Sequence, residues 1–312
     1  MDEMSTREAY GRAVVELGRE NPHIVVLDAD LSKSTMTQFF AAEFPERFFD
    51  CGIAEQNMMG IAAGLAASGK TPFASTFAVF AGGRCYDQVR MSIAQPRLNV
   101  KVAATHGGIT VGEDGFSHHS IEDLALFCSF PTFTVVVPAD ATETAQVIQA
   151  AAIAYGPFYI RLGRPKAPAV CDANYRFTLG QAVMMRGGWD ATVIACGLMV
   201  ARALEAADRL AREGIDCRVI NMSTLKPLDE GAIVRAAEET GAILTVEEHI
   251  AHGGLGSRVA QTVVARHPVP MSFLSIRDMY SSSGRPEELL ARHGLTADGI
   301  AEGVRTLVAR KG

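Results

Sequence analysis

Two spacings of apolar residues alternate along the chain from one end to the other. Short apolar runs rich in β-branched residues, such as "IVVLDAD" at 24–30 and "AILTVEE" at 242–248, are typical of buried parallel strands. Between such runs lie longer segments, such as residues 229–240 and 255–266, whose apolar positions recur with the period of a helix. The alternation predicts open, mostly parallel sheets that are covered by helices.

The first half of the chain contains most of the local signals. A capping box, "STRE" at residues 5–8, predicts the start of a helix. A second helix is expected over residues 79–94, and a third over "DATETAQVIQAAAIAY". A polar, glycine-rich loop at residues 106–120 follows the predicted strand "NVKVAAT". Ligands in open α/β sheets bind beyond the carboxyl ends of the strands, and this loop lies at such an end.

A segment with two prolines and no apolar period separates two series of strands and helices. We take this segment, residues 166–178, as a linker between a first domain at 1–165 and a second at 179–312. The predicted fold class is therefore α/β, with two doubly wound domains that each contain a mostly parallel sheet.

The segment "DCGIAEQNMMGIAAGLAASGK" at residues 50–70 places Glu55 at the start of a nearly all-apolar helix. An ionised carboxylate is costly to bury unless another group meets it. Glu55 is therefore either exposed on the favourable dipole of the helix start, or bound to a specific partner. In the same helix Gly60, Gly64 and Ser68 lie four residues apart, which predicts close packing either inside the monomer or against another subunit.

Composition narrows the class of protein. The chain has 312 residues, of which 48% are hydrophobic and 21% charged, and its net charge is −6. The acidic balance argues against nucleic-acid binding, and no apolar run argues for a membrane span. The charged N-terminus predicts no signal peptide, and six scattered cysteines favour reduced thiols in a cytoplasm over a disulfide framework.

The loop segment "THGGITVGEDGFSHHSIEDL" concentrates three histidines and several acids. A loop of this length is uncommon unless it is functional, although an exposed loop whose Ser120 caps the next helix remains an alternative. Zinc is disfavoured because His118 and His119 are adjacent and no second cluster has ligand spacing, so no metal ligand is predicted in this chain.

Five motifs in order identify a family resemblance. "GIAEQNM", "TFAVF", "THGGITVGEDGFSHHSIED" and "VVVPADATET" resemble the second half of a transketolase, and "TVEEHIAHGGLGSRVAQ" resembles the C-terminal domain of that family. The resemblance covers the whole chain. It implies a pyrimidine-binding domain, a transketolase C-terminal domain, and thiamine diphosphate as the cofactor, with the protein supplying placement and electrostatics.

The resemblance also implies cofactor-binding residues. Glu55 matches the glutamate that binds N1′ of the aminopyrimidine and activates the cofactor, and apolar surroundings would raise its proton affinity. Phe77 and Phe80 match the aromatic pocket around the pyrimidine, although core packing fits them equally well. Asp30 matches an acid near the cofactor, with a structural strand-end acid as the alternative. Arg84 matches an arginine near the active site.

The implied substrate residues lie in several loops. His106 matches a histidine near the substrate, Asp114 an acid that recognises the C2 hydroxyl, and His118 a catalytic histidine that contacts the donor hydroxyls and the reacting centre. Arg7, Ser34 and Arg164 match the group that holds the acceptor phosphate, and arginine offers a fork of donors suited to phosphate oxygens, with a plain helix-surface residue as the alternative for Arg7. Two positions depart from the family: His119 stands where glutamine is common, and Gly83 stands where tyrosine is frequent.

One part of the family's site is missing from the sequence. The diphosphate and Mg²⁺ site of the family rests on a GDG motif followed by asparagine, and the chain contains no such motif in the right context. We therefore expect an N-terminal, diphosphate-binding partner subunit that carries the Mg²⁺ ligands, in an α₂β₂ assembly. The chain alone would be inactive.

The function that follows is a split transketolase, which transfers a two-carbon ketol unit from a ketose phosphate to an aldose phosphate. Three alternatives stay open: the β subunit of a 2-oxo acid dehydrogenase E1 component, a deoxyxylulose-phosphate synthase-like enzyme suggested by "GRCYDQV", and a non-catalytic scaffold subunit. The sugars, and whether their anionic tail is a phosphate or a sulfonate, are left open as well.

Overall fold

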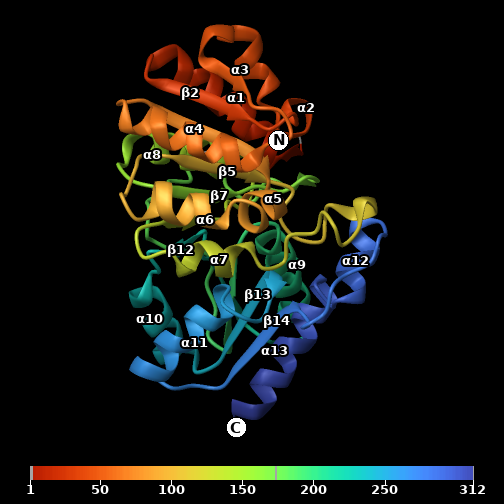
Figure 1. The fold of residues 1–312 in the computed structure, drawn as a ribbon. Helices are drawn as coiled ribbons and strands as arrows, with labels where there is room; N and C mark the ends of the chain where they lie inside the picture. The colour runs from red at the N-terminus through yellow and green to blue at the C-terminus, as the bar shows by residue number, and fades with distance from the viewer. Residues whose placement is uncertain (1–2, 173, 312) are drawn as a thin grey trace.

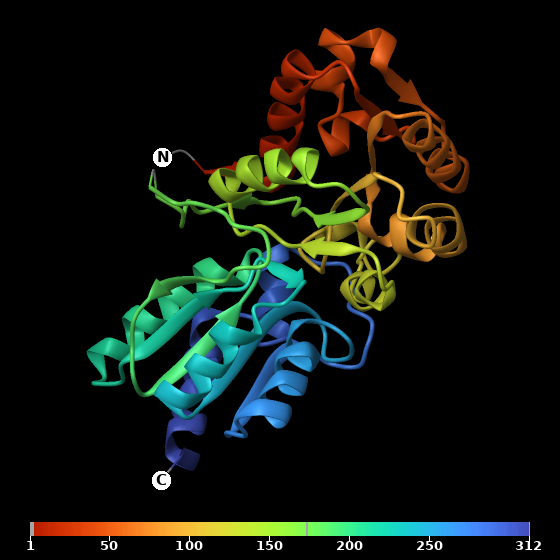
Figure 2. The ribbon, with the colours of Figure 1, turned by 90° about the vertical axis from the view of Figure 1, so that its left-hand side faces the viewer.

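The computed structural model describes residues 3–172 and 174–311. Its two large sheets lie end to end (Figures 1 and 2). The predicted domain limits at 1 and 312, and position 173 of the predicted linker, lie outside the described residues. Both sheets are mainly parallel and covered by helices, which confirms the predicted α/β class. Among the described residues no helix is long and apolar enough to cross a membrane.

The first sheet has seven strands, and every neighbouring pair is parallel except the one at the β12 edge. Its order is β12 (Thr224–Lys226), β6 (Thr134–Val136), β7 (Phe158–Arg161), β5 (Lys101–Thr105), β4 (Thr71–Phe77), β2 (Ile24–Asp28) and β3 (Phe48–Asp50). β12 belongs to the second half of the chain, so the two halves share this sheet.

The second sheet has five strands, of which only β9 is antiparallel. Its order is β14 (Met271–Ile276), β13 (Ile243–Ile250), β10 (Ala191–Ala195), β11 (Cys217–Asn221) and β9 (Val183–Arg186). A short antiparallel pair, β1 (Met4–Ser5) with β8 (Lys166–Ala167), links the N-terminus to the start of the predicted linker.

Helices bury their apolar faces in three clusters on the two sides of these sheets. One cluster lies under α4 (Glu55–Ala67), α7 (Asp123–Ser129), α10 (Glu230–Thr240) and α11 (Leu255–Arg266). A second cluster lies under α9 (Met199–Arg212), α12 (Pro286–Arg292) and α13 (Ala297–Lys311). The third lies under α1 (Thr6–Glu20), α3 (Gln38–Glu43) and α8 (Ala141–Ile153). Because the first cluster runs along both sheets, the two halves share one apolar core.

Two local predictions have different outcomes. Ser5 caps α1 by accepting a hydrogen bond from the backbone N–H of Glu8 at 3.3 Å, as the capping box predicts. The single helix expected over residues 79–94 is wrong: the chain forms α5 (Ala78–Gly83), α6 (Tyr86–Gln88) and a π-helical turn (Val89–Ala94). The Gly82–Gly83 pair accounts for the break, because glycine is a poor helix former.

The polar loop that follows β5 lies between the two halves of the chain. Its base is closed by a bridge between Gly108 and Ser120, in which the Gly108 N–H donates to the Ser120 carbonyl at 2.8 Å. Ser120 does not cap the next helix, since the N-cap position of α7 is Glu122. We call residues 108–120 the substrate loop, because its sequence supplies two of the predicted substrate residues.

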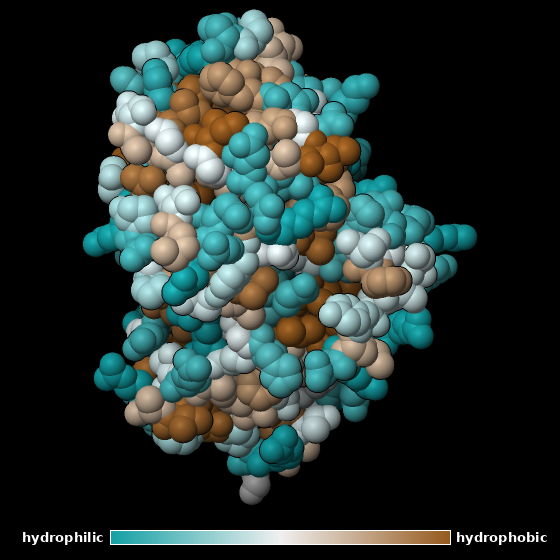
Figure 3. Space-filling model, viewed as in Figure 1, coloured by the Kyte–Doolittle hydropathy of each residue, from teal (hydrophilic) through white to brown (hydrophobic). Residues whose placement is uncertain are grey.

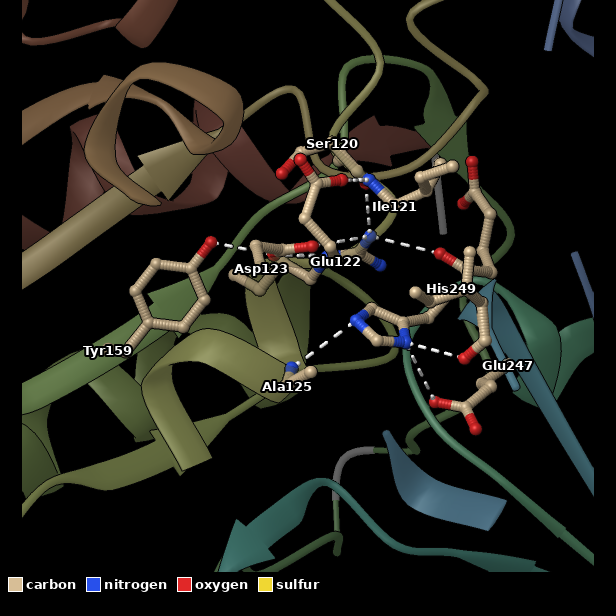
Figure 4. Close-up of polar contacts among 12 residues, drawn as sticks. Ser120, Ile121, Glu122, Asp123, Ala125, Tyr159, Glu247 and His249 are labelled. Atoms are coloured by element: carbon tan, nitrogen blue, oxygen red, sulfur yellow. Dashed lines mark hydrogen bonds and ion pairs between the residues drawn. The ribbon is translucent and has the colours of Figure 1, made fainter. Parts of the chain in front are cut away.

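A buried ion pair holds the junction of the two halves (Figure 4). The Arg161 side chain, 6% exposed, donates from Nε to Asp123 Oδ2 at 2.8 Å and from Nη2 to Asp123 Oδ1 at 3.2 Å. Tyr159 also donates to Asp123 Oδ2, at 2.6 Å. The same Nη2 also donates to the carbonyls of Ser120 and Glu248, both at 3.0 Å. The Arg161–Asp123 pair thus joins α7, the substrate loop and β13.

We predict that Arg161→Met lowers the free energy of unfolding by about 3–5 kcal/mol, because it leaves the Asp123 carboxylate buried without its counter-charge. Urea denaturation followed by circular dichroism measures this change. The control is Arg305→Met, which breaks the exposed pairs with Glu213 and Glu302 and should lower the free energy of unfolding far less. Equal losses in the two variants would show that the junction does not depend on this pair.

Candidate active site

Glu55 is the first residue of α4 and is only 4% exposed, so the exposed alternative for this carboxylate is wrong. Its partner within the chain is Arg84, whose Nη1 donates to Glu55 Oε1 at 2.5 Å. The guanidinium means that the surroundings of the carboxylate are not purely apolar. The Arg84 side chain is 48% exposed and can therefore move without opening the core.

Four rings from three segments form a wall beside this ion pair. Phe77 ends β4 and stacks on Phe80 of α5, with ring centroids 5.7 Å apart. The His106 ring also stacks on Phe77, with ring centroids 3.8 Å apart. The His118 ring meets Phe80 edge-on, with centroids 5.5 Å apart. Neither phenylalanine belongs to the three apolar clusters of the core. Phe77 and His106 are buried, whereas Phe80 and His118 are half-buried, so the wall runs from the interior toward the surface.

Arg84 connects the carboxylate to this wall. Its Cζ atom lies 4.0 Å from the centroid of the Phe80 ring, a cation–π distance, while its Nη1 pairs with Glu55. Gln56 fixes the Arg84 backbone by donating to its carbonyl at 3.0 Å. In front of these groups lies an open hollow lined by Ile53, Ala54, Glu55, Gln56, Asn57, Gly83 and Arg84. A Cβ atom at Gly83 would meet nothing within 4 Å, so this departure from the family leaves the wall open.

His106 follows β5 directly and occupies the left-handed region, with φ of 60°. Its ring is buried, and its Nδ1 lies 2.8 Å from the Thr105 hydroxyl. Burial, together with the positive charges of Arg7 and Arg164 and the nearby His118, lowers the pKa of His106 to about 3. The imidazole facing the site is therefore neutral at physiological pH.

Two arginines, Arg7 and Arg164, lie near enough to His106 for their charges to lower its pKa. Arg7 of α1 donates from Nη1 to the Ser34 carbonyl at 2.8 Å, so Ser34 lies beside it as predicted but contributes its backbone. Burial and the charge of Arg164 both lower the pKa of Arg7. The buried Arg7 Nε has no hydrogen-bond partner among the described residues. Two adjacent cations with an unused donor are suited to an oxyanion.

Asp114 and His118 lie in the substrate loop at the edge of the same site. Asp114 ends a 3₁₀ turn (Gly112–Asp114), is exposed, and its Oδ2 lies 3.6 Å from Arg164 Nη1. His118 is half-buried, and its Nδ1 lies 2.9 Å from the Ser117 hydroxyl. His119 points the other way: it is buried and its Nε2 donates to the Gly112 carbonyl at 3.0 Å. His119, which stands where glutamine is common in the family, thus binds the backbone inside the loop and does not face its outer surface.

The structure does not group Asp30 with these residues. Its side chain is exposed and its backbone N–H donates to Asp50 Oδ1 at 3.0 Å. The buried acid of this strand end is Asp28, which accepts hydrogen bonds from Thr35 at 2.6 Å and Thr37 at 2.9 Å. Burial raises the pKa of Asp28. Its position inside the apolar run "IVVLD" was the signal available in the sequence, and it indicates a structural acid.

The described part of the chain gathers no group of three or more histidine, cysteine, aspartate or glutamate side chains that could hold a metal ion. Sequence reasoning also missed the acids of β13, Glu247 and Glu248, of which Glu248 contacts the substrate loop. The doublet is visible in "TVEEHI", but nothing in a single sequence shows that it crosses to the other half of the chain.

Comparison with known proteins assigns both halves. The model of the transketolase pyrimidine-binding domain matches residues 2–169, and that of the transketolase C-terminal domain matches residues 180–300. The 6-deoxy-6-sulfo-D-fructose transketolase subunit of Clostridium sp. is 40% identical over 311 residues, which is 100% of this chain and 97% of that protein. Human transketolase is 41% identical over 313 residues, or 99% of this chain but 50% of that protein.

A solved structure gives the same result for the fold. It is described as a split gene transketolase in the form of an inactive beta4 tetramer. Its TM-score with this chain is 0.93 and its sequence identity 51%, with 99% of this chain and 100% of that chain covered.

We predict that His106 makes stability fall on acidification. Its pKa is about 3 in the folded state, against about 6.5 in an unfolded chain, so the unfolded state binds a proton first as pH falls below about 6.5. Between pH 6.5 and pH 5 the wild-type free energy of unfolding should therefore drop by about 2 kcal/mol more than that of His106→Asn. Asparagine is chosen because it tolerates the left-handed backbone.

Urea denaturation at a series of pH values measures this slope. His23→Asn, at an exposed position, serves as the control and should keep the wild-type slope. If His106→Asn and the wild type lose stability in parallel, the imidazole is not held neutral by the fold.

Proposed function

We propose that this chain, which belongs to the transketolase family, is one of two subunits of a thiamine diphosphate-dependent enzyme that transfers a two-carbon ketol unit from a ketose phosphate to an aldose phosphate. The observation that carries the proposal is a chain of contacts. It runs from the buried Glu55 through Arg84, Phe80 and Phe77 to His106, whose pKa is lowered by the charges of Arg7 and Arg164.

The residues present suit the aminopyrimidine of the cofactor. A flat heterocycle needs an aromatic wall, and its N1′ needs a carboxylate, which Phe77, Phe80 and Glu55 offer side by side. We infer that Arg84, which now covers Phe80 and neutralises Glu55, moves aside to admit the ring, since half of its side chain is exposed. Asp30 has no such support in its contacts, and we do not assign it to the cofactor.

The protein's part in the chemistry follows from these positions. When bound, thiamine diphosphate supplies the carbon nucleophile that ketol transfer requires. Glu55 would activate it by sharing a proton with N1′ at its carboxylate, in a buried place where that proton does not exchange freely with water. His118 stands at the edge of the wall, where it can donate to or accept from the donor's hydroxyls.

Substrate recognition is proposed for the far end of the surface. His106, being neutral, can accept or donate a hydrogen bond without adding charge beside the two arginines. Arg7 and Arg164, with Ser34 fixing Arg7, would hold the anionic tail, and Asp114 would take the C2 hydroxyl. A sulfonate offers the same oxyanion face as a phosphate, so both kinds of sugar belong in the test.

The diphosphate and Mg²⁺ sites are proposed for a partner subunit in an α₂β₂ assembly. In support, the chain spans about half the length of human transketolase. The α4 face also supports this proposal. Gly60 and Gly64 are exposed and an added Cβ would meet nothing within 4 Å, so close packing inside the monomer is not the reason for them. Exposed apolar side chains, including Ile53 and Ile61, flank this face, and the surface in Figure 3 shows such patches.

We also propose a cytoplasmic location. Six free thiols in the described residues fit a reducing compartment.

The direct test is a ketol-transfer assay with thiamine diphosphate, Mg²⁺, this chain and the separately encoded chain that carries the diphosphate-binding domain. We expect activity only with both chains, and loss of at least about 100-fold in Glu55→Gln, since the amide cannot exchange a proton with N1′. Glu46→Gln alters an exposed acid of the same domain and should leave turnover unchanged.

Ketose phosphates, sulfonated ketoses and pyruvate are the donors to compare. Activity with pyruvate alone would replace ketol transfer by the chemistry of a 2-oxo acid dehydrogenase component or a deoxyxylulose-phosphate synthase. Wild-type turnover by Glu55→Gln would exclude its role in activation.

A separate prediction concerns assembly. Gly64→Leu should fold at least as well as the wild type, because leucine favours the helix by about 1 kcal/mol and has open space here. The same side chain should block close packing of α4 against the partner. We expect size-exclusion chromatography with light scattering to show the loss of the mixed complex. Gly187→Leu, at an exposed position of the other half, is the control. Normal assembly of Gly64→Leu would place the interface elsewhere.

A further inference from the structure

The second half of the chain reaches across the junction and holds the base of the substrate loop. Glu248 of β13 is 5% exposed, and its Oε1 accepts a hydrogen bond from the Thr110 N–H at 2.6 Å. A Cβ atom at Gly108 would lie 2.2 Å from the same oxygen, so only glycine leaves room for the carboxylate there. The carboxylate thus sits directly against the first turn of the loop.

The other end of the loop is tied to the same point. Arg161 donates from Nη2 both to the Ser120 carbonyl and to the Glu248 carbonyl, each at 3.0 Å. Gly108 and Ser120 are bridged to each other, as described above. Both stems of the loop therefore depend on groups that contact Glu248. Asp114 and His118 lie between these stems.

Among the described contacts, the Glu248 carboxylate accepts from the substrate loop and faces the buried charge of Arg161. Burial raises the pKa of the Glu248 carboxyl, while Arg161 and the N–H groups of Thr110 and Ile109 act in the opposite direction. The neighbouring acid, Glu247, is buried too, but it accepts from the N–H groups of Leu255 and Gly256, at 2.7 and 2.8 Å, at the start of α11. Glu247 therefore binds a helix of its own half of the chain, whereas Glu248 binds the substrate loop of the first half.

The tip of the loop also contacts the second half. A Cβ at Gly112 would lie 3.2 Å from Pro286 Cδ, and one at Gly115 would lie 2.5 Å from Ser283 Oγ. α12 and the segment before it therefore lie directly beside the turn that carries Asp114 (Figure 1). The loop is supported at its base and at its tip by residues outside the first domain.

We propose that Glu248 is a positioning residue, which sets the place of Asp114 and His118 by anchoring the Thr110 N–H, so that the C-terminal domain contributes to donor binding without touching the donor. This inference rests on the proposed function of the two loop residues. The bond from a main-chain N–H to a carboxylate is charge-assisted, and such bonds are stronger than neutral ones.

The test compares Glu248→Asp, Glu248→Gln and Glu247→Asp in the assembled two-chain enzyme. Asp keeps the charge opposite Arg161 but withdraws the carboxylate from Thr110, whereas Gln keeps an acceptor oxygen at the same reach. In Glu248→Asp we expect amide hydrogen exchange of the Thr110 region to rise about tenfold and KM for the donor to rise about tenfold, with kcat changed far less. Glu248→Gln, which keeps an acceptor but loses the charge, should lie between the wild type and Glu248→Asp in both measurements.

Glu247→Asp is the matched control, because it shortens an equally buried carboxylate that serves α11. It should leave exchange in residues 106–120 and KM unchanged. Equal effects in Glu247→Asp and Glu248→Asp would overturn the proposal, because they would reflect general loosening. Faster exchange without a change in KM would overturn it too, as would wild-type behaviour of Glu248→Asp.

Glu248→Ala, which removes the carboxylate, gives the same reading if the aspartate variant does not fold. The exchange comparison needs no substrate. If the wild-type pair proves inactive on every sugar, the proposed function fails, whereas anchoring of the loop is still decided by the exchange rates.

Discussion

Glu55 is buried at the start of α4 and meets a single charged partner, the half-exposed Arg84. A carboxylate in that position costs free energy unless a donor meets it, and the proposed site is built around that requirement. Arg84 satisfies it within this chain while resting on Phe80, next to the stacked rings of Phe77 and His106. The same arrangement leaves an open hollow in front of the carboxylate. The proposal that a partner subunit completes the site places its far wall across this hollow.

Buried charged side chains also hold the junction between the two halves of the chain. Arg161 and Asp123 pair across the junction, and Glu248 accepts from the substrate loop, so the loop's place depends on both halves of the chain. β12 adds an edge strand to the first sheet, and one apolar cluster runs along both sheets. These contacts make the second half a structural support of the proposed site. Within the wall, the His106 ring lies under the positive charges of Arg7 and Arg164, and because it is neutral it adds no further charge there.

Much of the fold could be predicted from the sequence, because the signals are local. The apolar run "IVVLD" gave β2, and Ser5 with Glu8 gave the start of α1. The motifs that resemble transketolases contain the predicted site residues Glu55, Phe77, Phe80, His106 and His118, each of which contacts Arg84 or another member of this set. The break in the helix expected at 79–94 was harder to predict, since two glycines inside an apolar pattern do not reveal where a π-helical turn begins. The period of a strand does not say which acid at its end turns inward, so the sequence did not reveal that Asp28 is buried and Asp30 exposed.

Contacts between residues far apart in the sequence could not be predicted at all. Glu248 and Thr110 are 138 positions apart, and Arg84 and Glu55 are 29 apart, so no local period links them. The central claim, that this chain provides half of a cofactor site, is tested most directly by calorimetric titration of thiamine diphosphate with Mg²⁺. The titration is run into this chain, into the diphosphate-binding chain, and into their mixture. We predict tight, stoichiometric binding by the mixture and none of comparable strength by this chain alone. Equally tight binding by this chain alone would contradict the account.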